Sequence, residues 1–434
     1  MNKIISERNI ELDLLLQDAN LPRAINRLLD FVQDFSTNAQ FVTDALQIST
    51  DQRKLAKDIE EHTLVDFQEI EQQNQQIAQR IADLKQKIMD VYLLAIQVHA
   101  QNTREHEVAI LPSPDTASIP VEYPEDFPPI MECYGLSKTY RKSGFALNNI
   151  DLQLRLGEIT GLVGENGNGK TTLFKVLTGN LQHDSGKIGF PLLQRAKHAN
   201  GVNWIEVKSQ IAYVEQELPS WYGTLKQNIQ LELTQHGVKG AQNERDTAYI
   251  LERLGLTEHA QKKWSELSGG YKLRFALAKA LVWKPKLLVI DEPLANLDVR
   301  SQRIVLNDMK DLAKSAKNPI SIIISSQHLH EIESIADNLV FLHQGQMKYS
   351  GEKENIGIDR QHNFFELSCK IDKQTLDSLL TGLPITEIEH NGMSYVITGT
   401  KELEAQKILQ ALLHQDIEIE YFRNISNSAK RLFL

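Results

Sequence analysis

Apolar side chains recur at helical spacing near the start of the chain. Along one stretch they alternate steps of four and three, at Ile77, Ile81, Leu84, Ile88, Val91, Ala95 and Val98. Residues 1–105 contain one proline and no glycine, so this part is free of the strongest helix breakers. The pattern predicts an all-α bundle over 1–105 whose last helix is long and packs in a coiled-coil manner. It leaves open whether that helix docks on a partner, dimerises, or belongs to a plain helical hairpin.

The helical pattern stops at a proline-rich stretch. Six of the 13 prolines in the chain fall between Pro112 and Pro129. Proline fixes its own φ and pushes the preceding residue into extended conformations, so this stretch favours neither a helix nor a central strand. We expect residues 106–130 to form a semi-rigid linker.

After the linker, short apolar runs alternate with helical stretches. The runs lie at 158–164, 286–291, 320–326 and 338–343. Strands separated by helices are typical of a parallel sheet that helices cover on both faces. Over 131–355 the sequence therefore predicts an α/β domain.

The last part of the chain has a different order of patterns. It predicts a strand, a helix, two strands, a helix and a strand, at 364–371, 373–381, 385–390, 394–399, 401–414 and 416–422. This βαββαβ order is that of the ferredoxin-like split βαβ motif. We expect residues 356–434 to form a small α+β accessory domain of the ferredoxin-like class.

Composition narrows the classes of function. The chain carries 47 basic and 57 acidic residues, a net charge of −10, so no nucleic-acid partner is expected. The only two cysteines, Cys133 and Cys369, are far apart, which excludes a disulfide framework or a cysteine-based zinc site and fits a reducing compartment such as the cytosol. No apolar run approaches the roughly 20 residues of a membrane-spanning helix, and the first residues lack the apolar core of a signal peptide. Any membrane-spanning part is therefore expected on another chain.

A glycine-rich motif follows the first apolar run. It matches G-x-x-x-x-G-K-[ST] and is made of Gly164, Glu165, Asn166, Gly167, Asn168, Gly169, Lys170, Thr171 and Thr172. The motif follows an expected strand and opens an expected helix, which is the context it requires. The glycines let backbone N–H groups curl around a phosphate chain, and the helix N-terminus adds positive partial charge. Lys170 would reach the β- and γ-phosphates of a nucleotide, and Thr171 would ligate Mg²⁺.

The apolar run at 287–290 ends in two acids, Asp291 and Glu292. The carboxyl end of a buried strand is where ligands sit in open α/β sheets. Asp291 would hold Mg²⁺ through water, and Glu292 would act as general base on an attacking water molecule. Alone, the pair would be interpreted as solvated surface acids, but the phosphate loop favours the catalytic interpretation.

Between these two motifs, at the start of a helical run, stand Leu267, Ser268, Gly269, Gly270 and Tyr271. A phosphate loop, this LSGG segment and an Asp-Glu pair, in that order, make residues 131–350 resemble the ABC-type ATPases, whose signature sequence the segment matches. The resemblance implies a P-loop NTPase fold of the ABC type and Mg²⁺-dependent hydrolysis of ATP. It also implies that the signature of one subunit closes over the ATP held by another, so we expect a head-to-tail homodimer.

The resemblance assigns further roles. Tyr140 matches the aromatic residue that stacks on adenine. Gln216 matches the glutamine that senses Mg²⁺, which adds it to Thr171 and Asp291 as a metal-site residue. The loop that crosses to the opposite subunit, the D-loop, matches Asn296, Leu297 and Asp298.

Two positions depart from the family pattern. Tyr271 stands where the signature usually ends in glutamine, and little loss is expected because Ser268 and the two glycines make the phosphate contacts. The histidine that contacts the γ-phosphate in the family falls on Gln327, with His328 one residue late. A shift of one residue turns a side chain to another face, so we favour Gln327 in the role and keep His328 as the alternative.

The resemblance suggests two functions. The first is the ATP-binding, ATP-hydrolysing subunit of an ABC transporter, exporter-like, located on the cytoplasmic face of the membrane and paired with separate membrane-spanning permease chains. The second is a soluble mechanical or regulatory ATPase whose helical N-terminal part is the interaction module. Trp221 and Tyr222 bear on this choice, because they would be exposed anchors for a membrane partner or would pack inside the helical region at 226–265. The transported substrate is not encoded in any motif of the chain.

Overall fold

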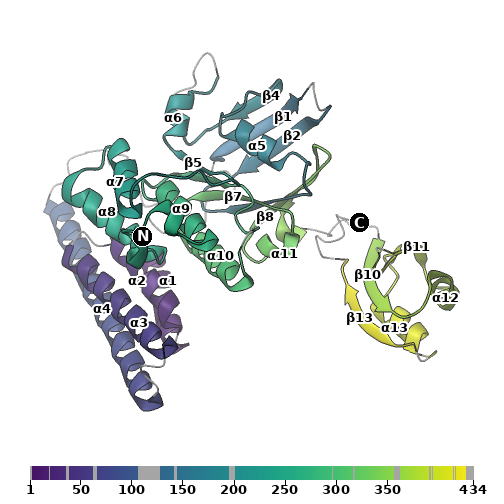
Figure 1. Cartoon of the computed structure of the whole chain (residues 1–434), viewed down its shortest axis with the longest axis horizontal. Helices are drawn as coiled ribbons and strands as arrows, with labels where there is room; N and C mark the ends of the chain where they lie inside the picture. The colour runs from purple at the N-terminus through teal and green to yellow at the C-terminus, as the bar shows by residue number, and fades with distance from the viewer. Residues whose placement is uncertain are drawn as a thin grey trace.

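The computed structural model describes residues 2–18, 20–35, 39–61, 66–105, 128–140, 144–194, 201–295, 297–315, 318–355, 362–390, 392, 394–413, 415 and 417–426. Figure 1 shows their arrangement. No helix in these ranges combines the length and the apolar character needed to cross a membrane.

Four helices come first: α1 (Asn2–Gln17), α2 (Leu21–Phe35), α3 (Ala39–Glu60) and α4 (Phe67–Glu105). They pack side by side, α4 against α2 and α3 (Figure 1). The apolar seam of α4 lies inside this group, because Ile77, Ile81, Leu84 and Ile88 are buried in one cluster with α1, α2 and α3. This part of the seam is therefore used within the chain. The rest of the seam, from Val91 on, has no described side chains.

The first four helices also contact the middle of the chain, where α2 and α3 pack against α8 (Gly240–Arg253). Arg253 has no exposed side-chain surface and donates from Nε to Asp30 Oδ1 at 2.8 Å and from one terminal nitrogen to Asp308 Oδ1 at 2.6 Å. Asp30 lies on α2 and Asp308 on α10 (Val299–Ala313). Burial by itself would lower the pKa of Arg253, but the two carboxylates raise it well above its usual value. One buried cation thus joins three helices.

Further polar contacts join the first four helices to α8 and α10. Glu252, whose side chain is 3% exposed, accepts hydrogen bonds from Ser49 and from Arg53, the latter at 2.8 Å. Arg27 of α2 donates to the backbone carbonyl of Asp311 on α10 at 3.4 Å. The partners are about 200 or more residues apart in the sequence, so the contacts depend on the folded arrangement.

The middle of the chain contains two sheets. The larger has the order β5-β6-β7-β3-β8-β9, in which the first five strands are parallel and β9 pairs antiparallel. The strands are β3 (Ile159–Val163), β5 (Ile211–Val214), β6 (Leu287–Ile290), β7 (Ser321–Ser326), β8 (Asn338–His343) and β9 (Gln346–Glu352). The smaller is antiparallel, with the order β2-β1-β4, and contains β1 (Met131–Thr139), β2 (Ala146–Leu154) and β4 (Ser185–Gly189). The expected parallel sheet thus accounts for only part of the strands, because the smaller sheet is antiparallel.

Helices and short turns cover both faces of the larger sheet (Figure 1). Two buried apolar clusters lie on its two sides, since Leu288 and Ile290 of β6 belong to one and Leu287 and Val289 to the other. Such two-sided burial explains the uninterrupted apolar run of this strand. Besides α8 and α10, the elements are α5 (Lys170–Leu177), α6 (Trp204–Lys208), α7 (Leu225–Gln235), η1 (Thr257–His259), η2 (Trp264–Glu266), α9 (Gly269–Leu281) and α11 (Leu329–Ile332).

After η3 (Lys353–Asn355) the last elements form a group of their own. They are β10 (His362–Cys369), α12 (Lys373–Leu379), β11 (Ile385–His390), β12 (Tyr395–Thr400), α13 (Ala405–Leu413) and β13 (Ile419–Asn424). The four strands make an antiparallel sheet with the order β11-β12-β10-β13. Phe365 and Ile397 of the sheet are buried with Leu376 of α12 and Ile408 of α13, so this group has its own apolar core.

Candidate active site

The phosphate loop lies between β3 and α5, at the carboxyl end of a central strand. Gly169 has φ of 100°, and a Cβ atom there would stand 2.5 Å from the ring of Phe145. At Gly164 a Cβ atom would stand 2.4 Å from the backbone oxygen of Leu342. Only glycine fits these two positions, which explains the spacing of the motif. Asn168 is buried, and its Oδ1 accepts a hydrogen bond from the backbone N–H of Gln344 at 2.9 Å, which ties the loop to the segment after β8.

Lys170 is the first residue of α5, and its side chain turns back into the loop. Its Nζ donates to the backbone carbonyls of Gly164 at 2.6 Å and Glu165 at 3.1 Å, and it forms an ion pair with Glu292 Oε1 at 2.9 Å. Lys170 is only 4% exposed. The N-terminus of α5 adds positive partial charge at the carboxyl end of β3, and the Lys170 ammonium lies there in a pair with Glu292.

Thr171, the next residue of the motif, hydrogen-bonds to Asp291, the first acid of the Asp-Glu pair. Thr171 Oγ1 donates to Asp291 Oδ2 at 2.6 Å. A hydroxyl and a carboxylate oxygen are hard ligands of the kind that Mg²⁺ takes, together with water and phosphate oxygens. The donor set therefore fits Mg²⁺. Thr172 follows on α5, and the tip residues of the loop, Glu165 and Asn166, are exposed.

Glu292 is the centre of the site. Besides Lys170, it accepts hydrogen bonds on Oε2 from Gln216 Nε2 at 3.0 Å and from Gln327 Nε2 at 2.7 Å. Its backbone φ is 44°, the left-handed region that a residue with a side chain rarely adopts. Strained backbone of this kind is common at functional sites. Three side chains that are far apart in the sequence thus meet at one carboxylate.

The structure distinguishes between the two residues at the family's histidine position. Gln327 contacts Glu292, whereas His328 is exposed and its ring lies 5.6 Å from that of His330, centroid to centroid. The reason is that β7 ends at Ser326, beside Val163 of β3, so the next side chain points toward the phosphate loop. The geometry therefore assigns Gln327, and not His328, to the candidate site.

Tyr140 follows β1 and is 37% exposed. Its ring is 6.5 Å from that of Phe145, the residue that closes against Gly169. Tyr140 thus lies one aromatic ring away from the phosphate loop.

The signature segment begins α9. Ser268 stands at the N-cap of this helix, Gly269 and Gly270 are its first residues, and Leu267 is buried. A Cβ atom on Gly270 would stand 3.5 Å from Leu297, which brings the segment beside the D-loop. Asp298 directly precedes α10, and its carbonyl accepts the backbone N–H of Gln302 at 2.9 Å. Asn296 lies outside the described residues.

Tyr271, the departure from the family signature, packs within its own helical region. Its ring meets that of His259 edge-on, with centroids 4.1 Å apart, and the Arg274 guanidinium stands 5.8 Å from it. The aromatic residue thus has a local packing role that a glutamine would not fill.

Sequence reasoning missed Ser325. This residue of β7 has no exposed surface, and its Oγ donates to Asp291 Oδ1 at 2.7 Å and accepts from the backbone N–H of Glu292 at 2.8 Å. The only signal for it was a polar residue at the end of an apolar strand.

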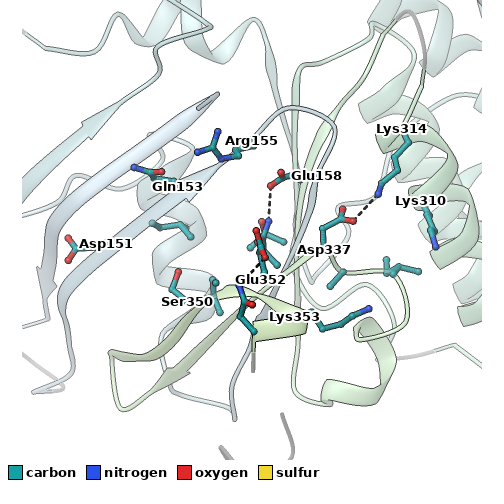
Figure 2. A pocket seen from close by; sticks show the side chains of 18 of the residues that line it. Asp151, Gln153, Arg155, Glu158, Lys310, Lys314, Asp337, Ser350, Glu352 and Lys353 are labelled. Carbon is teal, nitrogen blue, oxygen red and sulfur yellow. Dashed lines mark hydrogen bonds and ion pairs between the residues drawn. The ribbon is translucent and has the colours of Figure 1, made fainter. Parts of the chain in front are cut away.

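A second hollow lies at the opposite end of β3. Figure 2 shows this cleft, which has a volume of about 930 Å³ and is lined by charged side chains of both signs. Lys314 and Asp337 are 2.8 Å apart, and Asn338 donates to Glu158 at 2.7 Å. Burial raises the pKa of Glu158, an effect that the Asn338 hydrogen bond partly offsets.

Comparison with known proteins gives one family. Residues 147–295 match the family model described as "ABC transporter". The chain is 30% identical over 256 residues to the phosphonates import ATP-binding protein PhnC of Treponema denticola, which covers 56% of this chain and 97% of that protein. It is 31% identical over 229 residues to the linearmycin resistance ATP-binding protein LnrL of Bacillus subtilis, covering 52% of this chain and 70% of that protein.

The solved structure of cbiO1 from Clostridium perfringens, part of the ABC transporter complex cbiONQ, aligns with a TM-score of 0.48 and 23% identity, covering 59% of this chain and 97% of that one. The family model lies over the phosphate loop, the signature segment and the Asp-Glu pair, and the first relative is covered almost completely. From these matches, the chain belongs to the family of ABC transporter ATP-binding proteins, with their P-loop NTPase fold and their ATPase activity.

Proposed function

We propose that the chain hydrolyses ATP at the site around Glu292 and that this hydrolysis drives transport through separate membrane-spanning permease chains. The observation that carries the proposal is the meeting of Lys170, Gln216 and Gln327 on one carboxylate beside the phosphate loop. An ion pair between Lys170 and Glu292 is neutral overall, so a phosphate chain that draws the ammonium away leaves Glu292 available as a base.

Each residue has a defined task in this proposal. Lys170 and the backbone N–H groups of 164–169 bind the phosphates, and Tyr140 stacks on the adenine. Thr171 and Asp291 would hold Mg²⁺, with Gln216 near the same position, and the bound ion would neutralise charge on the phosphates. Replacing Lys170 by Ala is expected to abolish ATP binding, measured with a fluorescent nucleotide analogue.

Glu292 would take the proton of the attacking water. Gln327 is a neutral donor at 2.7 Å from Glu292 Oε2, which suits it to orient the carboxylate toward the attacking water. Unlike a histidine, its amide cannot change charge between pH 5 and 8. We therefore expect the rate of ATP turnover to show no change between pH 5 and 8 that corresponds to the titration of a histidine at this position.

We further propose a head-to-tail homodimer with two equivalent sites. Ser268 and Gly269 at the N-terminus of α9 supply free backbone N–H groups, and Leu297 lies beside them, so both segments would face the nucleotide of the partner subunit. The test is light scattering of Glu292→Gln with ATP and Mg²⁺. A dimer mass supports the proposal, and a monomer mass at saturating ATP contradicts it.

The surface after Gln216 supports a membrane partner. Tyr222 is 99% exposed, whereas Trp221 packs edge-on against Trp264 and Phe275 at centroid distances of 4.6 and 5.4 Å. Aromatic side chains such as tyrosine are enriched among the anchor residues of protein interfaces. We therefore propose Tyr222 as the contact with the permease, and Trp221 as its support.

The remaining parts complete the proposal. Residues 1–105 would be a helical bundle domain that packs on the ATPase domain at 131–355, and residues 356–434 would be a ferredoxin-like accessory domain. The whole chain would lie at the cytoplasmic face of the membrane.

The test of the transporter proposal is purification of the tagged full chain from its host in mild detergent. A stoichiometric multi-span membrane protein supports the transporter proposal. Soluble partners alone would favour the second candidate, a soluble ATPase in which the docked helices 1–105 are the interaction module.

A further inference from the structure

Ser325 occupies a central position between the two acids of the site. Strands β6 and β7 are parallel neighbours, and Ile290 pairs with Ile324, so Asp291 and Ser325 stand side by side where the two strands end. Ser325 has no exposed surface, and Asp291 is 1% exposed. In such a place every polar atom depends on its protein partner, because no solvent replaces a lost hydrogen bond.

The hydroxyl of Ser325 donates one hydrogen bond and accepts another. A serine hydroxyl has one donor and two acceptor positions. Here the donor goes to Asp291 Oδ1 at 2.7 Å, and an acceptor position takes the backbone N–H of Glu292 at 2.8 Å. One side chain thus fixes the carboxylate of one acid and the backbone of the other.

Both contacts have consequences for the chemistry. With Oδ1 held by Ser325, Asp291 presents Oδ2 to Thr171 at 2.6 Å, the side on which Mg²⁺ would lie. The bond to the N–H of Glu292 holds this residue at φ of 44°, and that conformation directs its side chain to Lys170 and Gln327. A backbone in the left-handed region needs such a constraint, since a residue with a side chain otherwise avoids it.

We propose that Ser325 is a positioning residue for ATP hydrolysis, which orients Asp291 toward the metal site and holds Glu292 in its reactive position. The inference rests on the proposed function of the site. Ser325 touches neither phosphate nor water in this role and acts through the two acids. Partners of metal-binding groups that do not themselves touch the metal typically contribute about 10–100-fold in metal affinity or activity.

The neighbouring Ser326 is the matched control. It is also a buried serine of β7, but its hydroxyl bonds to Glu331 and accepts the backbone N–H of His328 at 2.9 Å. Removing it deletes the same atom from the same strand without touching Asp291 or Glu292. Ser326→Ala therefore reports the cost of losing a buried hydroxyl at this strand end.

The experiment measures ATP turnover of the full chain against Mg²⁺ concentration at saturating ATP, and nucleotide binding without Mg²⁺. For Ser325→Ala we expect the half-saturating Mg²⁺ concentration to rise, or kcat to fall, by about 10–100-fold, with Mg²⁺-free binding unchanged. Ser326→Ala is expected to stay within about threefold of the wild type in all three quantities. Ser325→Cys has nearly the same volume but hydrogen-bonds weakly, so it gives the same test if the alanine variant does not fold.

The outcomes separate this inference from the proposed function. If Glu292→Gln is inactive while Ser325→Ala and Ser325→Cys behave as the wild type, the site stands and the role of Ser325 is wrong. Equal losses in Ser325→Ala and Ser326→Ala would also overturn the role, because strand damage would explain them. If Glu292→Gln hydrolyses ATP at the wild-type rate, the proposed function itself fails.

Discussion

Replacing Asp30 by Ala tests, through the free energy of unfolding, how strongly the first four helices are bound to the rest of the chain. This carboxylate accepts hydrogen bonds from Arg253 at 2.8 Å, from the Tyr249 hydroxyl at 2.9 Å and from Arg27 at 3.3 Å. Removing one partner of a buried ion pair typically costs about 3–5 kcal/mol. Since Asp308 stays 2.6 Å from Arg253, we expect Asp30→Ala to cost the lower figure, about 3 kcal/mol.

The assay is urea unfolding of the full chain, followed by far-UV circular dichroism and tryptophan emission. With a denaturant slope of about 3 kcal/mol per molar, a loss of about 3 kcal/mol lowers the urea midpoint by about 1 M. The tryptophans all lie outside the first four helices, at Trp204, Trp221, Trp264 and Trp283. A shift in tryptophan emission on changing Asp30 therefore reports that α2 stabilises the ATPase part across the interface.

Asp51→Ala is the matched control, because it breaks an exposed pair with Arg80 inside the same helices, 2.6 Å between charged atoms. Exposed pairs contribute about 0–1 kcal/mol, so the midpoint should move by less than about 0.3 M. If Asp30→Ala shifts tryptophan emission no more than Asp51→Ala does, the docked arrangement of α2 is wrong.

Three further predictions concern other parts of the chain. Gln327→Ala should lower ATP turnover by about 100-fold and His328→Ala by less than about twofold, measured as phosphate release. Tyr222→Ala should keep basal hydrolysis and lose stimulation by the membrane partner, whereas Trp221→Ala should lower the free energy of unfolding by about 3 kcal/mol, measured in urea. Burial raises the folded-state pKa of Glu158, so its contribution to stability is present below its usual pKa near 4.5 and is lost as the pH rises through the folded pKa. Glu158→Gln should therefore have a higher urea midpoint than the wild type at pH 8, and the gap should close as the pH falls toward 4.5.

Each of these predictions has a contradicting result. Equal turnover losses at 327 and 328 would show that the site does not distinguish the two residues. Loss of basal hydrolysis in Tyr222→Ala would place Tyr222 in the fold of the ATPase part. A stability gain for Glu158→Gln that is independent of pH would show that ionisation of this carboxyl is not its cause.

The strands that carry the site could be predicted from the sequence because their signals are local. The run at 286–291 becomes β6 and the run at 320–326 becomes β7, and the phosphate loop opens α5 as its motif requires. An apolar run buried on both faces and a glycine-rich turn depend on neighbouring residues only.

The rest depends on contacts between distant segments. Ser325 became visible only through the register of β7 beside β6, and Gln327 through the point at which β7 ends. No local pattern marks Asp30 as an interface residue, because its partner Arg253 lies 223 residues away in the sequence and meets it only in the fold. The smaller antiparallel sheet was missed because its strands, such as β1 with alternating burial, lack a continuous apolar run.

ATP hydrolysis by Glu292→Gln tests the central claim most directly. The measurement compares phosphate release by the full-length wild type and variant in the presence of Mg²⁺, with ATP affinity determined in parallel. The account predicts that the variant binds ATP at least as tightly as the wild type while turnover falls by about 100-fold or more, because the amide keeps the shape of the side chain but cannot accept a proton from water. Turnover at the wild-type rate in Glu292→Gln would contradict it.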